Sequence, residues 1–144
     1  MKYSRRDLSL LLAALATGEA ADGTALASGT FDHDALPART NGPNQVRPIL
    51  QGQTHTGSPI ELHETELAPG QAPHPPHHHV HEEMLMIREG TLEVTIGDKK
   101  TNLGPGSAAY VASNEHHGWR NVGTNRAQGW AHRLSCQRGG SKMA

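Results

Sequence analysis

A concentration of metal-ligating side chains lies in the stretch from Gly70 to Gly90. Its central residues follow the spacing His77-x-His79-x-x-x-Glu83. Side chains of a β-strand alternate between its two faces, so His77, His79 and Glu83 share one parity and point the same way on an extended chain. Two imidazoles and one carboxylate on one face can supply three ligands to a single metal ion. A fourth ligand has to come from elsewhere in the chain.

Short predicted strands separated by turns surround this stretch. The clearest covers residues 91–96, where Leu92, Val94 and Ile96 alternate with polar residues, the pattern of a half-buried strand. A hairpin turn is expected after it at Gly97-Asp98. Further strands are expected over residues 46–51, 60–67, 84–89, 100–103, 108–111, 119–122 and 126–134. This regular spacing of strands and turns predicts an all-β sandwich or barrel.

The composition is that of one domain without a large net charge. The chain has 144 residues and a formal net charge of -1 with neutral histidines. Such a balance gives no strong field that attracts nucleic acid, so no nucleic-acid partner is expected. The single cysteine, Cys136, excludes an intrachain disulfide. Histidine is the compositional outlier, with 11 residues in the chain.

The first residues have the pattern of an export signal. Lys2, Arg5 and Arg6 form a basic start, and an apolar run follows over residues 8–16. This run is too short to span a bilayer. Ala25-Leu26-Ala27 then has the small-x-small pattern of a cleavage site. Together these features predict a secretory signal peptide over residues 1–27.

The basic part of this signal, Ser4-Arg5-Arg6-Asp7-Leu8, resembles the twin-arginine signal that exports folded proteins. An ordinary N-terminal helix carrying two arginines is the alternative. If the signal is removed, the mature protein lies in the periplasm or outside the cell, without membrane contact after cleavage. The expected organisation is a signal peptide at 1–27, an extended arm at 28–45, one domain at 46–134 and a flexible tail at 135–144.

The central stretch resembles the first motif of the cupin superfamily. That motif is a glycine, then His-x-His, three or four residues, a glutamate, six residues and a glycine. Here these positions are Gly70, His77, His79, Glu83 and Gly90. The distance from the first glycine to the first histidine is one residue longer than in the common pattern.

A second stretch resembles the other cupin motif, a glycine turn, a strand, a loop and His-x-x-x-Asn. Gly106 begins the strand, and His117 and Asn121 form the final pair. The usual Pro-x-Gly of the loop is replaced by Ala112-Ser113-Asn114. The two motifs occur in the family's order and separation, and the resemblance covers residues 60 to 134.

The resemblance implies a jelly-roll, or double-stranded β-helix, barrel with one metal ion inside. Carried onto this chain, the metal ligands are His77, His79, Glu83 and His117. Four protein ligands leave one or two coordination positions open. An imidazole-rich site with one carboxylate suits a divalent transition metal, with copper favoured and manganese or iron next.

Alternatives for the ligand set stay open. The histidine-rich run from 74 to 81 could be a flexible metal-buffering tract. His116 competes with His117, although the His-x-x-x-Asn spacing favours His117. By strict alternation His81 also faces inward, and it becomes a ligand only if the chain stays extended between His79 and Glu83. A bend is expected there.

Three further residues are candidates for the pocket around the metal. Trp119 shares the parity of His117, so it could line the pocket or serve only in core packing. Tyr110 and His63 are the other candidates for pocket or catalytic residues.

The predicted function is that of an exported, mononuclear, metal-dependent oxidoreductase that uses O2 or H2O2. By size, export and metal motif, the chain is similar to secreted copper cupins that oxidise polysaccharides such as cellulose. The scarcity of tryptophan, with Trp119 and Trp130 alone, counts against a polysaccharide substrate. A small-molecule substrate is the other expectation.

Two alternatives belong to other functional classes. One is a non-redox metal-dependent isomerase, lyase or decarboxylase that acts on a small polar acid. The other is a metal-binding or ligand-binding protein without turnover. A homodimer is expected because cupins commonly pair through the edges of their sheets.

Overall fold

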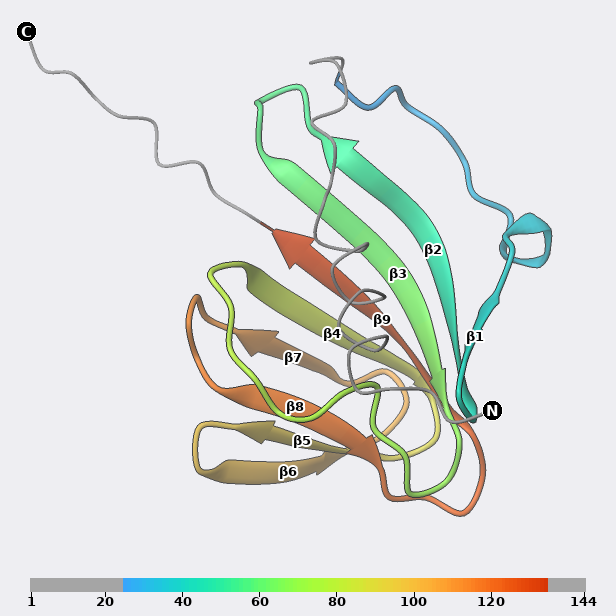
Figure 1. Cartoon of the computed structure of the whole chain (residues 1–144), viewed down its shortest axis with the longest axis vertical. Coiled ribbons are helices and arrows are strands. Elements are labelled where there is room, and N and C mark those ends of the chain that lie inside the picture. Colours follow the sequence, from blue (N-terminus) through green and yellow to red (C-terminus); the bar gives the residue numbers. More distant parts are fainter. Residues whose placement is uncertain (1–24, 135–144) are drawn as a thin grey trace, which may run out of the picture.

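The computed structural model of the chain describes residues 25–134, which form nine strands and one short 3-10 helix (Figure 1). The predicted signal peptide up to residue 24 and the predicted tail with Cys136 lie outside the described residues. The elements are η1 His33–Ala35, β1 Arg39–Asn41, β2 Asn44–Gln53, β3 Pro59–Leu67, β4 Glu82–Glu89, β5 Leu92–Ile96, β6 Lys99–Leu103, β7 Ala108–Val111, β8 His117–Asn121 and β9 Ala127–Leu134. No helix in this part of the chain is long and apolar enough to cross a membrane.

The strands form two antiparallel sheets. The larger has six strands in the order β1-β2-β3-β9-β4-β7, and the smaller has three in the order β6-β5-β8 (Figure 1). The buried core draws on β3, β4 and β9 of the larger sheet and on β5 and β8 of the smaller one. Its members are Leu67, Leu85, Ile87, Leu92, Val94, Trp119, Ala127 and Ala131. The architecture is a jelly-roll β-sandwich, which confirms the predicted all-β class.

The strands predicted from alternation correspond closely to the observed ones. β7 has the expected bounds, and β5 begins at Leu92, one residue later than expected. Leu92 and Val94 are buried, as the alternation predicts. Gly90, in the turn between β4 and β5, has a φ of 80°, and a Cβ added there would lie 2.6 Å from the Cβ of Ala127. A side chain cannot fit at that distance, so this motif position requires glycine.

The range expected to be an extended arm contains regular structure. β1 pairs with β2 in a short hairpin, in which Arg39 lies opposite Val46. The turn residue Gly42 has a φ of 59°, which suits the reversal. The 3-10 helix η1 lies nearby, and its His33 places Nε2 3.2 Å from Oε1 of the buried Glu64. This part of the chain therefore extends the larger sheet.

Candidate metal centre

The histidines of the two motifs meet through backbone pairing. His77 and His79 belong to the ligand segment, defined here as residues 68–81 between β3 and β4, and His117 is the first residue of β8. The N–H of His77 donates to the carbonyl of His117 at 2.9 Å, and the N–H of His117 donates to the carbonyl of His77 at 2.8 Å. These two bonds form an isolated antiparallel bridge. Directly opposed residues of such a pair have their side chains on the same face.

Two buried asparagines hold the beginning of the ligand segment. The side chain of Asn44 accepts from the N–H of Ala68 and donates to the carbonyl of Ala72, both at 3.1 Å. The side chain of Asn121 donates to the carbonyl of Leu67 at 3.0 Å. Asn121 is fully buried and Asn44 nearly so. Removing a partner from a buried amide is costly, so both side chains fix this segment firmly.

The end of the ligand segment is held by the loop before β8. The N–H of Asn114 donates to the carbonyl of His79 at 2.8 Å, and the hydroxyl of Ser113 donates to the carbonyl of Val80 at 2.8 Å. Asn114 has a φ of 63°, in the left-handed region that asparagine tolerates better than most residues. This is the loop in which Ala112-Ser113-Asn114 departs from the common cupin pattern. The sequence that stands here in place of the common pattern therefore has a local role, which is to position His79.

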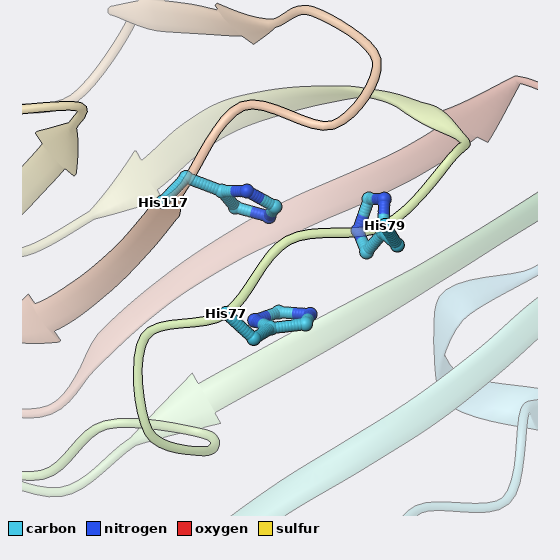
Figure 2. A group of neighbouring side chains, drawn as sticks. All are labelled: His77, His79 and His117. Carbon is cyan, nitrogen blue, oxygen red and sulfur yellow. The ribbon is translucent and has the colours of Figure 1, made fainter.

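Three imidazoles and one carboxylate converge at this point. Ring nitrogens of His77, His79 and His117 all lie within 4.8 Å of one another. Figure 2 shows the three rings gathered between the ligand segment and the start of β8. Glu83, which β4 supplies, places its Oε2 3.1 Å from Nε2 of His79 and 3.1 Å from Nε2 of His117. Both Glu83 and His117 are buried.

The hydrogen bonds of two rings determine which nitrogen carries the proton. Nδ1 of His79 lies 2.9 Å from the carbonyl oxygen of His81, and Nδ1 of His117 lies 2.8 Å from that of Glu115. A carbonyl only accepts, so each Nδ1 carries the hydrogen and each neutral ring presents a lone pair at Nε2. Both lone pairs face Oε2 of Glu83. With both rings neutral, three acceptor atoms lie within hydrogen-bond distance of one another, and a metal ion placed among them would be coordinated by all three, so these residues fit a metal ion.

His77 is suited to the same role by its protonation state. Burial, followed by the neighbouring His74, lowers the pKa of His77 to about 4. Its ring is therefore neutral near pH 7, as a metal ligand has to be. Nδ1 of His77 is buried and has no hydrogen-bond partner among residues 25–134. A buried polar atom without a partner is uncommon, and a bound ion is one explanation for it.

A row of partly exposed charged side chains lies beside the buried Glu83. Arg133 on β9 is opposite Glu83 on β4 and opposite Glu61 on β3. Its Nε lies 3.5 Å from Oε1 of Glu83, and its Nη1 lies 3.5 Å from Oε2 of Glu61. His63, two residues further along β3, places Nδ1 3.2 Å from Oε1 of Glu61 and lowers the pKa of that carboxyl. The carboxylate of Glu83 therefore faces a guanidinium on one side and imidazoles on the other.

The three predicted pocket residues have different surroundings. The ring of Trp119 lies 6.0 Å from that of His117, and its side chain is part of the buried core, so the residue combines both expected roles. His63 faces the interior next to Glu61. Tyr110 does not line the interior, because it is 54% exposed. On β7 it alternates with the buried Val111 and points away from the core.

The alternatives for the ligand set can now be placed. His116 is exposed, whereas His117 is buried beside Glu83. The chain bends at residues 80 and 81 before β4 begins, as expected, and His81 is not among the three histidines that converge. The centroid of its ring is 5.7 Å from that of His79. His78 is exposed on the outer side.

Two residues next to the site were not singled out from the sequence. The ring of His74 packs edge-on against that of His77, with 4.2 Å between their centroids. Arg133 holds Glu83 from the opposite side. The place of Arg133 in β9 could have indicated this role from the sequence. The other inward positions of the strand are the small residues Ala127, Gly129 and Ala131. An arginine at the end of such a series indicates a polar interior.

The sequence matches a family model, and the fold matches solved structures. The family model described as a cupin domain matches residues 63–129. No curated protein matches the sequence. Among solved structures, the RmlC-like cupin from Shewanella frigidimarina has a TM-score of 0.63 and 15% identity, with 77% of this chain and 95% of that chain covered.

Two further structures show the same likeness. KdgF from a Halomonas species has a TM-score of 0.65 and 15% identity, with 77% of this chain and 97% of that chain covered. The polyketide cyclase RemF from Streptomyces resistomycificus has a TM-score of 0.61 and 17% identity, with 75% of this chain and 80% of that chain covered. Identity at this level shows a shared fold and leaves the reaction of this chain open.

Proposed function

We propose that this chain, which resembles a cupin domain over residues 63–129, binds one divalent transition metal ion through His77, His79, His117 and Glu83. The observation that carries the proposal is the short distance between two imidazole nitrogens and one carboxylate oxygen. Nε2 of His79 and Nε2 of His117 each lie 3.1 Å from Oε2 of Glu83, while both Nδ1 atoms face backbone carbonyls. A metal ion among these atoms would be coordinated by both imidazoles and the carboxylate at once.

We infer further that the protein is an oxidoreductase that uses O2 or H2O2. A transition metal with open coordination positions supplies electron transfer to such a co-substrate. Copper is the favoured ion because affinity for imidazole-rich sites rises to Cu(II) along the divalent series, with manganese or iron next. Similar folds include proteins described as a polyketide cyclase and a sugar phosphate isomerase, so the redox class rests on the ligand chemistry alone.

The surrounding residues of the chain have supporting roles in this proposal. Arg133 balances the charge of Glu83 and fixes the orientation of its carboxylate. Trp119 covers the ring of His117 on the core side and keeps water away from it. His63 and Glu61 supply groups that can accept or donate a proton at the interior end of the site.

We favour a small molecule as the substrate. Of the two tryptophans on which a sugar chain would stack, Trp119 is buried and the guanidinium of Arg88 lies over the ring of Trp130 at 6.0 Å. Export to the periplasm or the cell exterior is part of the proposal and depends on the signal-like residues 1–27. A homodimer is also proposed, and light scattering during size-exclusion chromatography tests it.

The deciding experiment compares His117→Ala with His116→Ala. His116 is the matched control because it is adjacent to His117 in the sequence but exposed. Untagged wild type should contain about one metal ion per chain by elemental analysis, give the paramagnetic signal of that ion and consume peroxide. His117→Ala should lose the metal and the activity, whereas His116→Ala should keep both. Equal metal content in both variants would contradict the site.

The non-redox alternative has one observation in its favour. Arg133 presents a guanidinium inside the protein next to the site, where it could hold the carboxylate of a small polar acid. Wild type that contains metal but consumes no peroxide with copper, manganese or iron would favour this Lewis-acid class. An occupied site without turnover of any substrate would favour a binding protein.

A further inference from the structure

A second cavity lies outside the metal centre, against the face of the three-stranded sheet that is turned away from the core. Its volume is about 230 Å³. One wall is the ligand segment, and the other is formed by side chains of β5, β6 and β8. The lining residues are Ala72, His74, Pro76, Glu93, Thr95, Lys100, Gly118, Trp119 and Arg120.

The cavity arises because the ligand segment bulges away from β8. The two run side by side at His77 with His117 and again at Gln71 with Asn121. From 71 to 77 the segment advances six residues, while β8 advances four from 117 to 121, so two residues are in excess. Pro76 closes one side, since a Cβ on Gly118 would lie 3.1 Å from its Cγ.

The charges in this cavity are unbalanced. Nζ of Lys100 lies 3.3 Å from Oε1 of Glu93, and Nη2 of Arg120 lies 3.4 Å from the same oxygen. Two cations thus share one carboxylate oxygen, so among the described residues that line the cavity one positive charge is in excess and most N–H donors of Lys100 and Arg120 have no protein acceptor. Lys100 and Arg120 are both more than half exposed, so an incoming anion can reach them.

The inner end of the cavity touches the metal centre. His74 lines the cavity, and its ring lies 4.2 Å from that of His77 and 6.0 Å from that of Trp119, centroid to centroid. Nδ1 of His74 faces the carbonyl of Pro75 at 3.1 Å, which leaves Nε2 as an acceptor on a neutral ring. A molecule in the cavity would therefore meet cations at the outer end and a neutral imidazole at the inner end.

We propose that this cavity, called here the carboxylate pocket, binds a small molecule that carries a carboxylate. The carboxylate accepts hydrogen bonds from Lys100 and Arg120, in competition with Glu93. The rest of the molecule packs on Ala72 and Pro76. This binding site is separate from the metal site and does not require the ion.

The first test measures binding of succinate to the full chain prepared without metal. Trp119 lines the pocket, so its fluorescence should change in a saturable way, and Trp130→Phe removes the other indole signal. Calorimetry on unaltered protein provides the second measurement. Arg120→Met and Lys100→Met should each weaken binding about fivefold to tenfold, because each loses a hydrogen bond to a charged group. Arg126→Met, with the same charge change on an ion pair with Glu66, should bind as wild type does.

The second test predicts a gain of affinity. Glu93→Gln removes the competing carboxylate and should tighten succinate binding severalfold. Asp98→Asn changes the net charge equally at an exposed turn outside the pocket and should have no effect. Absence of saturable binding to wild type would overturn the proposal, as would equal responses of Glu93→Gln and Asp98→Asn. Because no metal is present, this outcome is independent of whether the metal site is correct.

Discussion

The two ends of the jelly-roll interior are built on the same strands but have opposite chemistry. At one end, the inward residues of β3, β4 and β9 are Leu67, Ile87 and Ala127, all buried and apolar. At the other end the same three strands present Glu61, Glu83 and Arg133. The apolar end contributes hydrophobic burial, whereas the polar end places metal-ligating groups and charged side chains close together. Stability and metal binding should therefore be separable by mutation.

The largest expected effect on stability comes from a substitution at the apolar end. Leu67→Ala removes a side chain that is 2% exposed and should lower the free energy of unfolding by about 3 kcal/mol. Denaturant unfolding of the metal-free protein measures this change. Metal affinity of the folded variant should stay within about twofold of wild type, because Leu67 belongs to the apolar core and is not one of the proposed ligands. A parallel loss of metal affinity would contradict the separation of the two ends.

The next effect concerns the polar end. Arg133→Met removes the guanidinium that orients Glu83 and should weaken metal binding about tenfold to a hundredfold. A competition titration with a chelator of known affinity measures it. Arg126→Met is the matched control, since its ion pair with Glu66 is remote from the ligands. A positioning role also predicts an altered paramagnetic spectrum of bound copper, which simple loss of stability does not produce.

Glu83→Gln is expected to stabilise the metal-free protein slightly, in contrast to the destabilisation expected from Leu67→Ala. Without metal, the glutamine amide can donate a hydrogen bond to an Nε2 lone pair of His79 or His117, where the carboxylate can only repel it. The free energy of unfolding should rise by about 1 kcal/mol in the absence of metal. Metal affinity should fall in the same variant. Destabilisation of the metal-free protein would show that the acceptors are already satisfied by protons.

The pH dependence of the stability of the metal-free protein should arise in part from His77. Its pKa is lowered to about 4 in the fold, below the ordinary value near 6.5, so the unfolded chain binds more protons between these values. Its contribution to stability is fully present above about pH 6.5 and is lost as the pH falls toward 4. Denaturant unfolding of metal-free His77→Gln should show a shallower loss over this range. The exposed His78→Gln should keep the slope of wild type.

The smallest effect is expected on the outer face. Tyr110→Ser alters a side chain that is 54% exposed and points away from the core. The free energy of unfolding should change by no more than about 0.5 kcal/mol, and metal affinity should be unchanged. A large loss of either would mean that a partner covers Tyr110 in solution, and size-exclusion chromatography would then show it.

Most of the fold could be predicted from the sequence, because alternation and glycine turns are local signals. β7 was predicted with its observed bounds, and β5 to within one residue. The hairpin of β1 and β2 was missed, since residues 39–41 are polar and pair through backbone groups that leave no apolar pattern. Parity predicted one direction for His77, His79 and Glu83, but the chain bends at residues 80 and 81, so Glu83 approaches the two histidines from β4 and not along one strand face.

The surroundings of the site were harder to predict, because they depend on tertiary contacts. The role of Asn114 follows from a hydrogen bond to His79, 35 residues earlier in the chain. The position of His74 depends on a bulge that appears only when two distant segments are paired. Tyr110 was expected at the pocket, although its alternation with Val111 already pointed it outward. Pairing and parity have to be combined before such residues can be assigned.

The ligand segment has a second consequence, which concerns solubility. Through His77 and Gln71 it covers the outer edge of β8, the last strand of the smaller sheet. An uncovered strand edge offers unpaired N–H and C=O groups to other chains and promotes aggregation. A substitution that loosens this segment, such as at Asn44 or Asn121, should therefore cause self-association at high protein concentration. In this fold, the residues that prepare the metal site also shield the chain from its own copies.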